Sequence, residues 1–306
     1  MGSEFVPLTL PPLVIATLAA LACAAPGNFL LLRRQALLGD AISHVVLPGL
    51  VAAFLLTGSA APPVMLAGAL AAAALSALMI EAIRRTTSAD PGAAMGATFT
   101  TMFAAGVLLL ELSGASATHL DVEHALYGSL EALIWIDATD WSSLLDPAAL
   151  AGLPPELPQL ALICAAVLGL IAALWRPLVI ATFDEGFAAT QGIPVRLLSA
   201  ALTGLTALAA VAAFSAVGSI LTIAMLVCPP ATARLMTDSL PRQMGLSLLI
   251  AATAAVLGTL AAGYLPLLMG LPFAVSAAGS IAALSGLFLA LAAAFGPRRL
   301  PLSRAA

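Results

Sequence analysis

Long apolar stretches, broken by glycine, proline and arginine, make up most of this chain. About 20 mostly apolar residues suffice for a helix to cross a bilayer. Nine such stretches are apparent, at approximately 8–32, 36–57, 62–83, 92–113, 158–180, 195–213, 217–236, 244–264 and 272–295. The joint between the sixth and seventh is very short, so a re-entrant helix there is the alternative to two full crossings. The pattern predicts an all-α, polytopic membrane protein with eight to nine transmembrane helices.

The basic residues indicate the orientation of these helices. With the N-terminus outside, every arginine falls in or beside a loop on the cytoplasmic side, as the positive-inside rule requires. The C-terminus is then cytoplasmic, as are loops at 181–194 and 231–244, whereas a long loop at 114–157 lies on the outer face. The arginines are Arg33, Arg34, Arg84, Arg85, Arg176, Arg196, Arg234, Arg242, Arg298, Arg299 and Arg304.

Composition supports this organisation and excludes several functions. Of the 306 residues, 62% are hydrophobic and 8% are charged, against roughly 45–50% and about 25% in soluble domains. All 11 basic residues are arginines, and the absence of lysine excludes a P-loop and Schiff-base chemistry. Any ATP hydrolysis must therefore be supplied by another chain. Met1–Phe5 resembles a cloning remnant, 6–300 reads as a single membrane domain and 301–306 as a cytoplasmic tail.

Asp40 and His44 are the sharpest chemical pair within an apolar segment. Their i, i+4 spacing places both on one helix face, and counting from Arg33 and Arg34 puts His44 roughly 15 Å deep in the membrane. A carboxylate and an imidazole suit Mn²⁺, Zn²⁺ or Fe²⁺. One chain offers only these two ligands, and a second copy across a two-fold axis would offer four. A proton relay and a structural ion pair remain alternatives at this point.

The outer loop contains a tight cluster of metal-ligand residue types, His119, Asp121, Glu123 and His124. This acidic patch is interpreted as a docking surface or, alternatively, as a metal site. Farther along the loop, Trp135 and Trp141 have helical spacing, which favours an amphipathic helix over 126–141 lying on the membrane surface.

Two cytoplasmic segments have the character of docking elements. Residues 184–193 read as a short amphipathic turn of helix that begins with Asp184 and Glu185 and is stopped by Gly192. Residues 231–244 follow a Pro-Pro pair and alternate charged with apolar positions. The segment 231–244 fits a groove of a soluble partner, and an ordinary interfacial helix is the alternative for it.

Four stretches, in order along the chain, resemble the permeases of ABC importers for manganese, zinc and iron. They are Leu32–Leu50 (LRRQALLGDAISHVVLPGL), His124–Leu130 (HALYGSL), Phe183–Ile193 (FDEGFAATQGI) and Val217–Ala233 (VGSILTIAMLVCPPATA). The segment after Tyr264 matches less well. The resemblance implies a fold distantly like that of the vitamin B12-type importer permeases.

The resemblance also implies partners and site residues. It implies an importer made of two permeases, identical or related, two ABC ATPase subunits and an extracytoplasmic metal-binding protein, in a bacterial plasma membrane. The chain itself is then not an enzyme, and its cargo is a divalent ion held by Asp40 and His44. The main ATPase coupling residues would lie within 231–244, and 184–193 would be a second contact. A proton-coupled secondary transporter that uses Asp40 and His44 as a relay is the alternative. The main coupling residues would be Ala231, Arg234, Leu235, Asp238 and Arg242.

Overall fold

A computed structural model describes residues 5–59, 62–88, 90–112, 130–268, 270 and 275–297, and in these ranges the regular structure is entirely helical. The longer helices are α2 (Leu10–Leu32), α3 (Leu37–Thr57), α4 (Pro62–Thr86), α5 (Pro91–Leu112), α8 (Glu156–Ala173), α11 (Val195–Val217), α12 (Ser219–Met236), α13 (Leu240–Leu268) and α14 (Ala277–Phe295). The short ones are α1 (Phe5–Leu8), η2 (Leu130–Ala132), η3 (Trp141–Leu145), α7 (Pro147–Ala151), α9 (Trp175–Phe183) and α10 (Glu185–Thr190).

The membrane-spanning architecture expected from the sequence is confirmed. Within the described ranges, eight helical segments are long and apolar enough to cross a bilayer. The helix α3 is 21 residues long and contributes a shorter apolar stretch, His44–Thr57. The short joint between the sixth and seventh apolar stretches is a single residue, Gly218. Its φ of +82° lets α11 end and α12 begin without an intervening loop.

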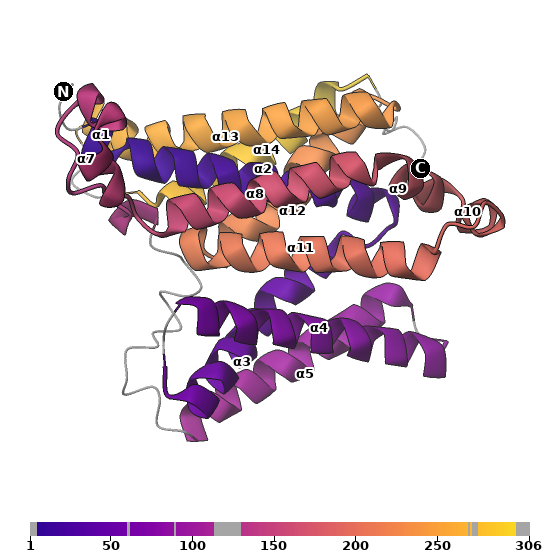
Figure 1. The fold of residues 1–306 in the computed structure, drawn as a ribbon. Helices are drawn as coiled ribbons and strands as arrows, with labels where there is room; N and C mark the ends of the chain where they lie inside the picture. The colour runs from indigo at the N-terminus through magenta and orange to yellow at the C-terminus, as the bar shows by residue number, and fades with distance from the viewer. Residues whose placement is uncertain are drawn as a thin grey trace.

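The helices form two groups (Figure 1). The helices α3, α4 and α5 pack on one another, and α11 and α12 join them to the larger group. In the larger group α2 is central, because it packs against α8, α11, α12 and α13. Its residues from Ala22 to Leu30 are all buried. The helix α2 is thus surrounded by protein along its second half.

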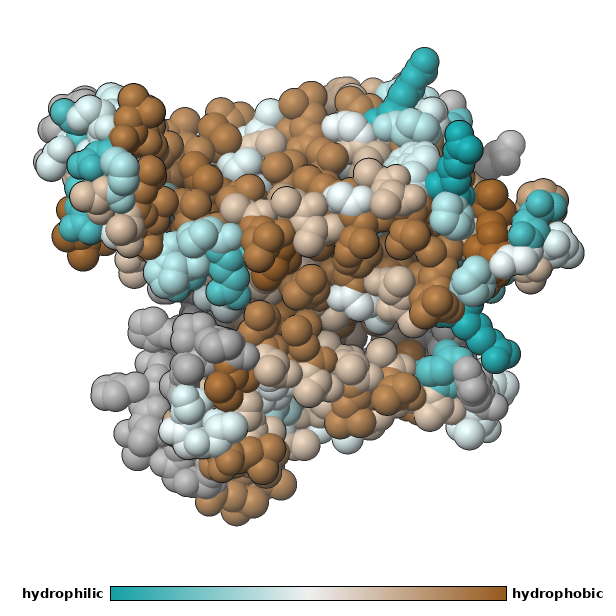
Figure 2. Space-filling model, in the orientation of Figure 1, coloured by the Kyte–Doolittle hydropathy of each residue, from teal (hydrophilic) through white to brown (hydrophobic). Residues whose placement is uncertain are grey.

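Polar residues gather at the two ends of the bundle, with a broad apolar band between them (Figure 2). The C-terminal end of α2, the start of α11 and the corner between α12 and α13 carry Arg33, Arg34, Arg196, Arg234 and Arg242. The contacts of Arg33 with α9 and α11 tie these elements together at one end. This grouping agrees with the cytoplasmic end predicted from the arginine pattern.

Small residues let the helices approach closely, as is usual in membrane bundles. A Cβ added at Gly27 of α2 would lie on the carbonyl oxygen of Leu226 in α12. At the crossing of α3 with α4, Gly49 and Gly68 face each other, and at the crossing with α5 the ring of Pro48 fills the space beside Gly106. These close contacts help to fix how the helices cross.

The expected amphipathic helix over 126–141 is wrong for its described part. Residues 130–132 form a 3₁₀ turn, and 133–140 are not helical. Trp135 is 1% exposed and packs with Val6, Ala138 and Ala149, and its indole N–H donates to the carbonyl oxygen of Ala149 at 2.7 Å. It therefore builds a small outer core and is not a membrane anchor. Trp141 remains 57% exposed and stacks on Phe5.

We expect Gly27→Ala to lower the free energy of unfolding by about 1–3 kcal/mol, because the new methyl group forces α2 away from α12. The measurement is the thermal midpoint of the purified chain in detergent. Gly204→Ala on α11 is the matched control, since a Cβ there meets no atom within 4 Å. A Gly27→Ala midpoint equal to that of the control would contradict the close packing.

Candidate metal site and cytoplasmic contacts

The helix α3 carries the two predicted metal ligands, packs against α12 near its start and ends at a left-handed glycine. Near its start, Gly39 lies against the side chain of Leu226 in α12. Its end is closed by Gly58, whose φ is +66° and whose N–H donates to the carbonyl oxygen of Phe54. Asp40 and His44 are one turn apart on this helix. The side chain of Asp40 lies outside what the structure describes.

His44 lies in the three-helix group and faces α5. The imidazole stacks on the ring of Phe99, with centroids 5.3 Å apart, and meets Phe103 edge-on at 5.7 Å. His44 is half-buried, so its ring is enclosed but not sealed. Two α5 aromatics thus hold the ring of the predicted ligand in a defined position.

One copy of the chain does not complete a metal site from its described side chains. Among them, no three His, Cys, Asp or Glu residues come together in a way that could hold an ion. Asp40 is not among these residues, because its side chain is not described. The second predicted cluster, His119, Asp121, Glu123 and His124, also lies outside the described residues.

The described acidic residues of the outer loop have local structural roles. Asp140 caps η3 and accepts hydrogen bonds from the backbone N–H and the hydroxyl of Ser142, which lower the pKa of its carboxyl. Asp146 caps α7 in the same way. Glu131 accepts a hydrogen bond from the backbone N–H of Ala277, at the start of α14. These contacts shape the outer face.

At the end of the bundle that carries Arg33, residues 184–193 form the expected short helix, α10. The carboxylate of Asp184 caps its start by accepting the N–H of Phe187 at 2.8 Å. Gly192 ends it with a φ of +75°, and the N–H of Ile193 returns to the carbonyl oxygen of Ala188. The helix projects beyond the end of the bundle (Figure 1), and Glu185 and Phe187 are exposed.

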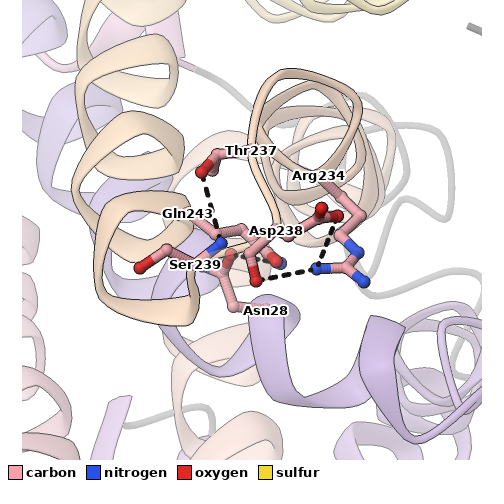
Figure 3. Close-up of polar contacts among 6 residues, drawn as sticks. All are labelled: Asn28, Arg234, Thr237, Asp238, Ser239 and Gln243. Atoms are coloured by element: carbon pink, nitrogen blue, oxygen red, sulfur yellow. Dashed lines mark hydrogen bonds and ion pairs between the residues drawn. The ribbon is translucent and has the colours of Figure 1, made fainter. Parts of the chain in front are cut away.

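The segment 231–244, predicted as a cytoplasmic loop, is instead a tight helical corner. The helix α12 continues to Met236 and α13 begins at Leu240, so Ala231, Arg234 and Leu235 are helical and half-buried. Arg234 closes the corner by donating to the carbonyl oxygen of Asp238 at 3.3 Å, with the Asp238 carboxylate 3.9 Å away (Figure 3). Arg242, in the first turn of α13, is exposed.

A buried polar network, which the sequence pattern did not predict, lies beside this corner. Asn28 of α2 accepts a hydrogen bond from the amide of Gln243 in α13 at 3.1 Å (Figure 3). It also donates to the hydroxyl of Ser247, in the same helix, at 2.6 Å. All three residues are fully buried. The available signal was one amide within the apolar run 8–32, but its partners lie more than 200 positions away.

Arg33, directly after α2, has a partly buried guanidinium group at the same end. Its Nε donates to the hydroxyl of Thr182 in α9 at 3.1 Å, and one terminal nitrogen donates to that of Ser199 in α11 at 2.9 Å. Burial lowers the pKa of Arg33, and the negative charge of Glu185 acts in the opposite direction. The other terminal nitrogen, Nη2, is buried without a partner among the described atoms.

Comparison with known families decides what these helices belong to. The model of the ABC 3 transport family matches residues 6–145 and 148–295, which is nearly the whole chain. The chain belongs to the ABC 3 transport family. It is therefore the membrane-spanning permease of an ABC transporter and not the ATPase, as the absence of lysine predicts.

Relatives of this permease are similar over almost their entire length. The chain is 38% identical to the manganese transport system membrane protein MntD of Bacillus subtilis, over 93% of this chain and 91% of that protein. It is 33% identical to the zinc transport system membrane protein TroC of Treponema pallidum, over 90% and 88%. Both relatives are bacterial membrane proteins, and the permease is likewise a multi-pass membrane protein.

Solved structures agree with the fold of the permease. PsaBC from Streptococcus pneumoniae, solved in complex with a Fab, matches with a TM-score of 0.72 at 29% identity, over 95% of this chain and 92% of that one. An inward-facing, putative metal-chelate type ABC transporter matches with a TM-score of 0.64 at 16% identity, over 93% and 85%. The second likeness concerns the fold alone and agrees with the distant relation expected from the sequence.

We expect Asn28→Leu to lower the free energy of unfolding by about 1–3 kcal/mol, because it leaves the amide of Gln243 buried without an acceptor. Chemical denaturation of the purified permease measures this loss. The double variant Asn28→Leu with Gln243→Leu should lose less than the sum of the two single variants. Strictly additive losses would show that the two amides are not coupled.

Proposed function

We propose that this permease carries divalent manganese or zinc into the cell in an ATP-driven importer, with Asp40 and His44 as ligands of the ion in transit. The match to the ABC 3 transport family over both halves of the chain carries this proposal. The relatives named for manganese and zinc transport support the choice of cargo. An imidazole and a carboxylate suit both ions, and Fe²⁺ as well.

A complete site needs more ligands than one chain supplies. We infer that two permeases meet about a two-fold axis, so that two Asp40–His44 pairs face one ion. Four protein ligands can replace most of the water around a divalent ion. The ion also offsets the unfavourable desolvation of two carboxylates deep in the bilayer. The partner permease is an identical copy or a related chain.

The ATPase contact is better placed on α10 than on the 231–244 corner, which reverses the order of importance expected from the sequence. Phe183 and Phe187 are 62% and 53% exposed at the cytoplasmic end, and α10 projects there as a short rigid element (Figure 1). In the corner, by contrast, most of the described residues from Ala231 to Leu235 are buried or half-buried. We assign α10 as the main ATPase contact, with Asp238 and Arg242 as a second one.

Transport then follows from relative movement of helices. Closure of two ATPase subunits on ATP moves α10 and opens the permease pair outward. An extracytoplasmic metal-binding protein delivers the ion to Asp40 and His44. Return to the inward-open state releases the ion to the cytoplasm. The exchange depends on ligands that hold the ion firmly enough to bind it and weakly enough to release it.

We expect Asp40→Ala or His44→Ala to abolish accumulation of radioactive manganese or zinc in cells, because either change removes one of the two ion ligands that each chain supplies. The ATPase should still co-purify with each variant. Glu111→Gln is the matched control, since this acidic residue lies exposed at the end of α5. Normal uptake in both variants would refute the site, and uptake that persists without any ATPase would favour the proton-coupled carrier.

We expect Phe187→Asp to reduce co-purification of the ATPase by at least about tenfold, because it places a charge within an apolar contact. Charge reversal at Arg234 or Arg242 should weaken the interaction less. Affinity capture of the complex measures each effect at equal permease abundance. If only the arginine variants lose the ATPase, the corner is the main contact and the assignment to α10 is wrong.

A further inference from the structure

The guanidinium of Arg33 joins three elements that are far apart in the sequence. Arg33 follows the last residue of α2, Thr182 lies at the end of α9 just before α10, and Ser199 lies in the second turn of α11, just after α10. The two hydrogen bonds, at 3.1 and 2.9 Å, therefore hold the segments on both sides of α10. The stretch from Thr182 to Ser199, which contains α10, is called the α10 elbow below. Any displacement of the α10 elbow relative to α2 must therefore stretch or break a hydrogen bond of Arg33.

Arg33 also stands at the corner that leads into α3. The N–H of Gln35 donates to the carbonyl oxygen of Leu30 at 2.8 Å, and that of Arg34 donates to Leu31 at 3.1 Å. This is a Schellman closure, in which a glycine usually takes the left-handed position. Here Arg34 takes it with a φ of +57°, and α3 begins at Leu37. The corner is thus short and strained.

The guanidinium of Arg33 has fewer hydrogen-bond acceptors than it has nitrogen donors, as expected of a group that exchanges partners. Two hydroxyls accept its protons, but Nη2 is buried without a hydrogen-bond partner in the described part of the chain. The charge of Glu185 on α10 acts on the guanidinium. A purely structural arginine would gain more from a carboxylate in direct, two-point contact.

We propose that Arg33 is a coupling residue, which transmits movement of the α10 elbow to the α2–α3 corner and so to the helix that carries Asp40 and His44. This inference rests on the proposed function, because it takes α10 as the ATPase contact and α3 as the ion-binding helix. In this proposal Arg33 acts through the α2–α3 corner and not on the ion itself, so it is a positioning residue for α3.

The test compares ATP hydrolysis with ion transport in one sample. The complex of the permease and its ATPase is reconstituted in liposomes, and Mn²⁺ is supplied on its extracytoplasmic binding protein. For Arg33→Gln we expect assembly and an ATPase rate within about twofold of the unaltered complex, whereas the Mn²⁺ transported per ATP falls about tenfold, as for loss of a charge-assisted contact. Arg33→Lys, which keeps the charge, should restore part of the ratio.

One control separates coupling from general damage. Arg176→Gln removes an exposed arginine that lies outside the α2–α3 corner and should leave the ratio unchanged. If Arg33→Gln does not assemble, the double variant Thr182→Val with Ser199→Ala removes both acceptors and should lower the ratio in the same way. A normal ratio in Arg33→Gln, or in the double variant where that is used, overturns the inference.

The same experiment distinguishes this inference from the proposed function. His44→Ala must abolish transport if the proposed site is correct. Transport in His44→Ala would refute the site, whatever Arg33 does. Loss of transport in His44→Ala with an unchanged ratio in the Arg33 or Thr182–Ser199 variants would refute the coupling role alone.

Discussion

A polar group within a bilayer is tolerated only if a partner satisfies it or a function requires it. Close approaches between helices in this permease accordingly occur at apolar positions, such as Gly27 against Leu226 and Gly49 against Gly68. Against this background a few polar side chains stand out. Asn28 is satisfied by α13, whereas the guanidinium of Arg33 is only partly satisfied by α9 and α11. Asp40 and His44 share one face of α3, and an ion would account for their place there.

The helix α2 connects these features. Its glycine contact fixes it to α12, its asparagine to α13, and the arginine that follows it to α9 and α11. The chain then turns directly into α3, which packs with α4 and α5. The permease thus has a well-anchored larger group and a smaller group entered through one corner. Under the proposed function, this arrangement would let movement at the arginine-rich end of the bundle reach α3, the helix of the proposed ion ligands, through the α2–α3 corner.

The spans were predictable because bilayer thickness sets their length, and α10 was predictable because Asp184 and Gly192 are local start and stop signals. Other features depend on distant partners that no local pattern reveals. Trp135 has helical spacing, yet Ala149 and the N-terminal segment draw it into a core. The segment from Ala231 stays helical as far as Met236 because a membrane helix tolerates Pro229 and Pro230. Asn28 meets residues more than 200 positions away. Family membership followed from ordered motifs, whereas the ligand set remains a prediction from residue type and spacing.

The most direct test of the ion site is the coordination of Mn²⁺ in the purified permease–ATPase complex. Electron spin-echo spectroscopy detects coupling between bound Mn²⁺ and the nitrogen of a ligating imidazole, and metal analysis gives the stoichiometry. The account predicts one Mn²⁺ per two permease chains and a nitrogen coupling that disappears in His44→Ala. One ion per chain, or a nitrogen coupling that survives His44→Ala, would contradict it.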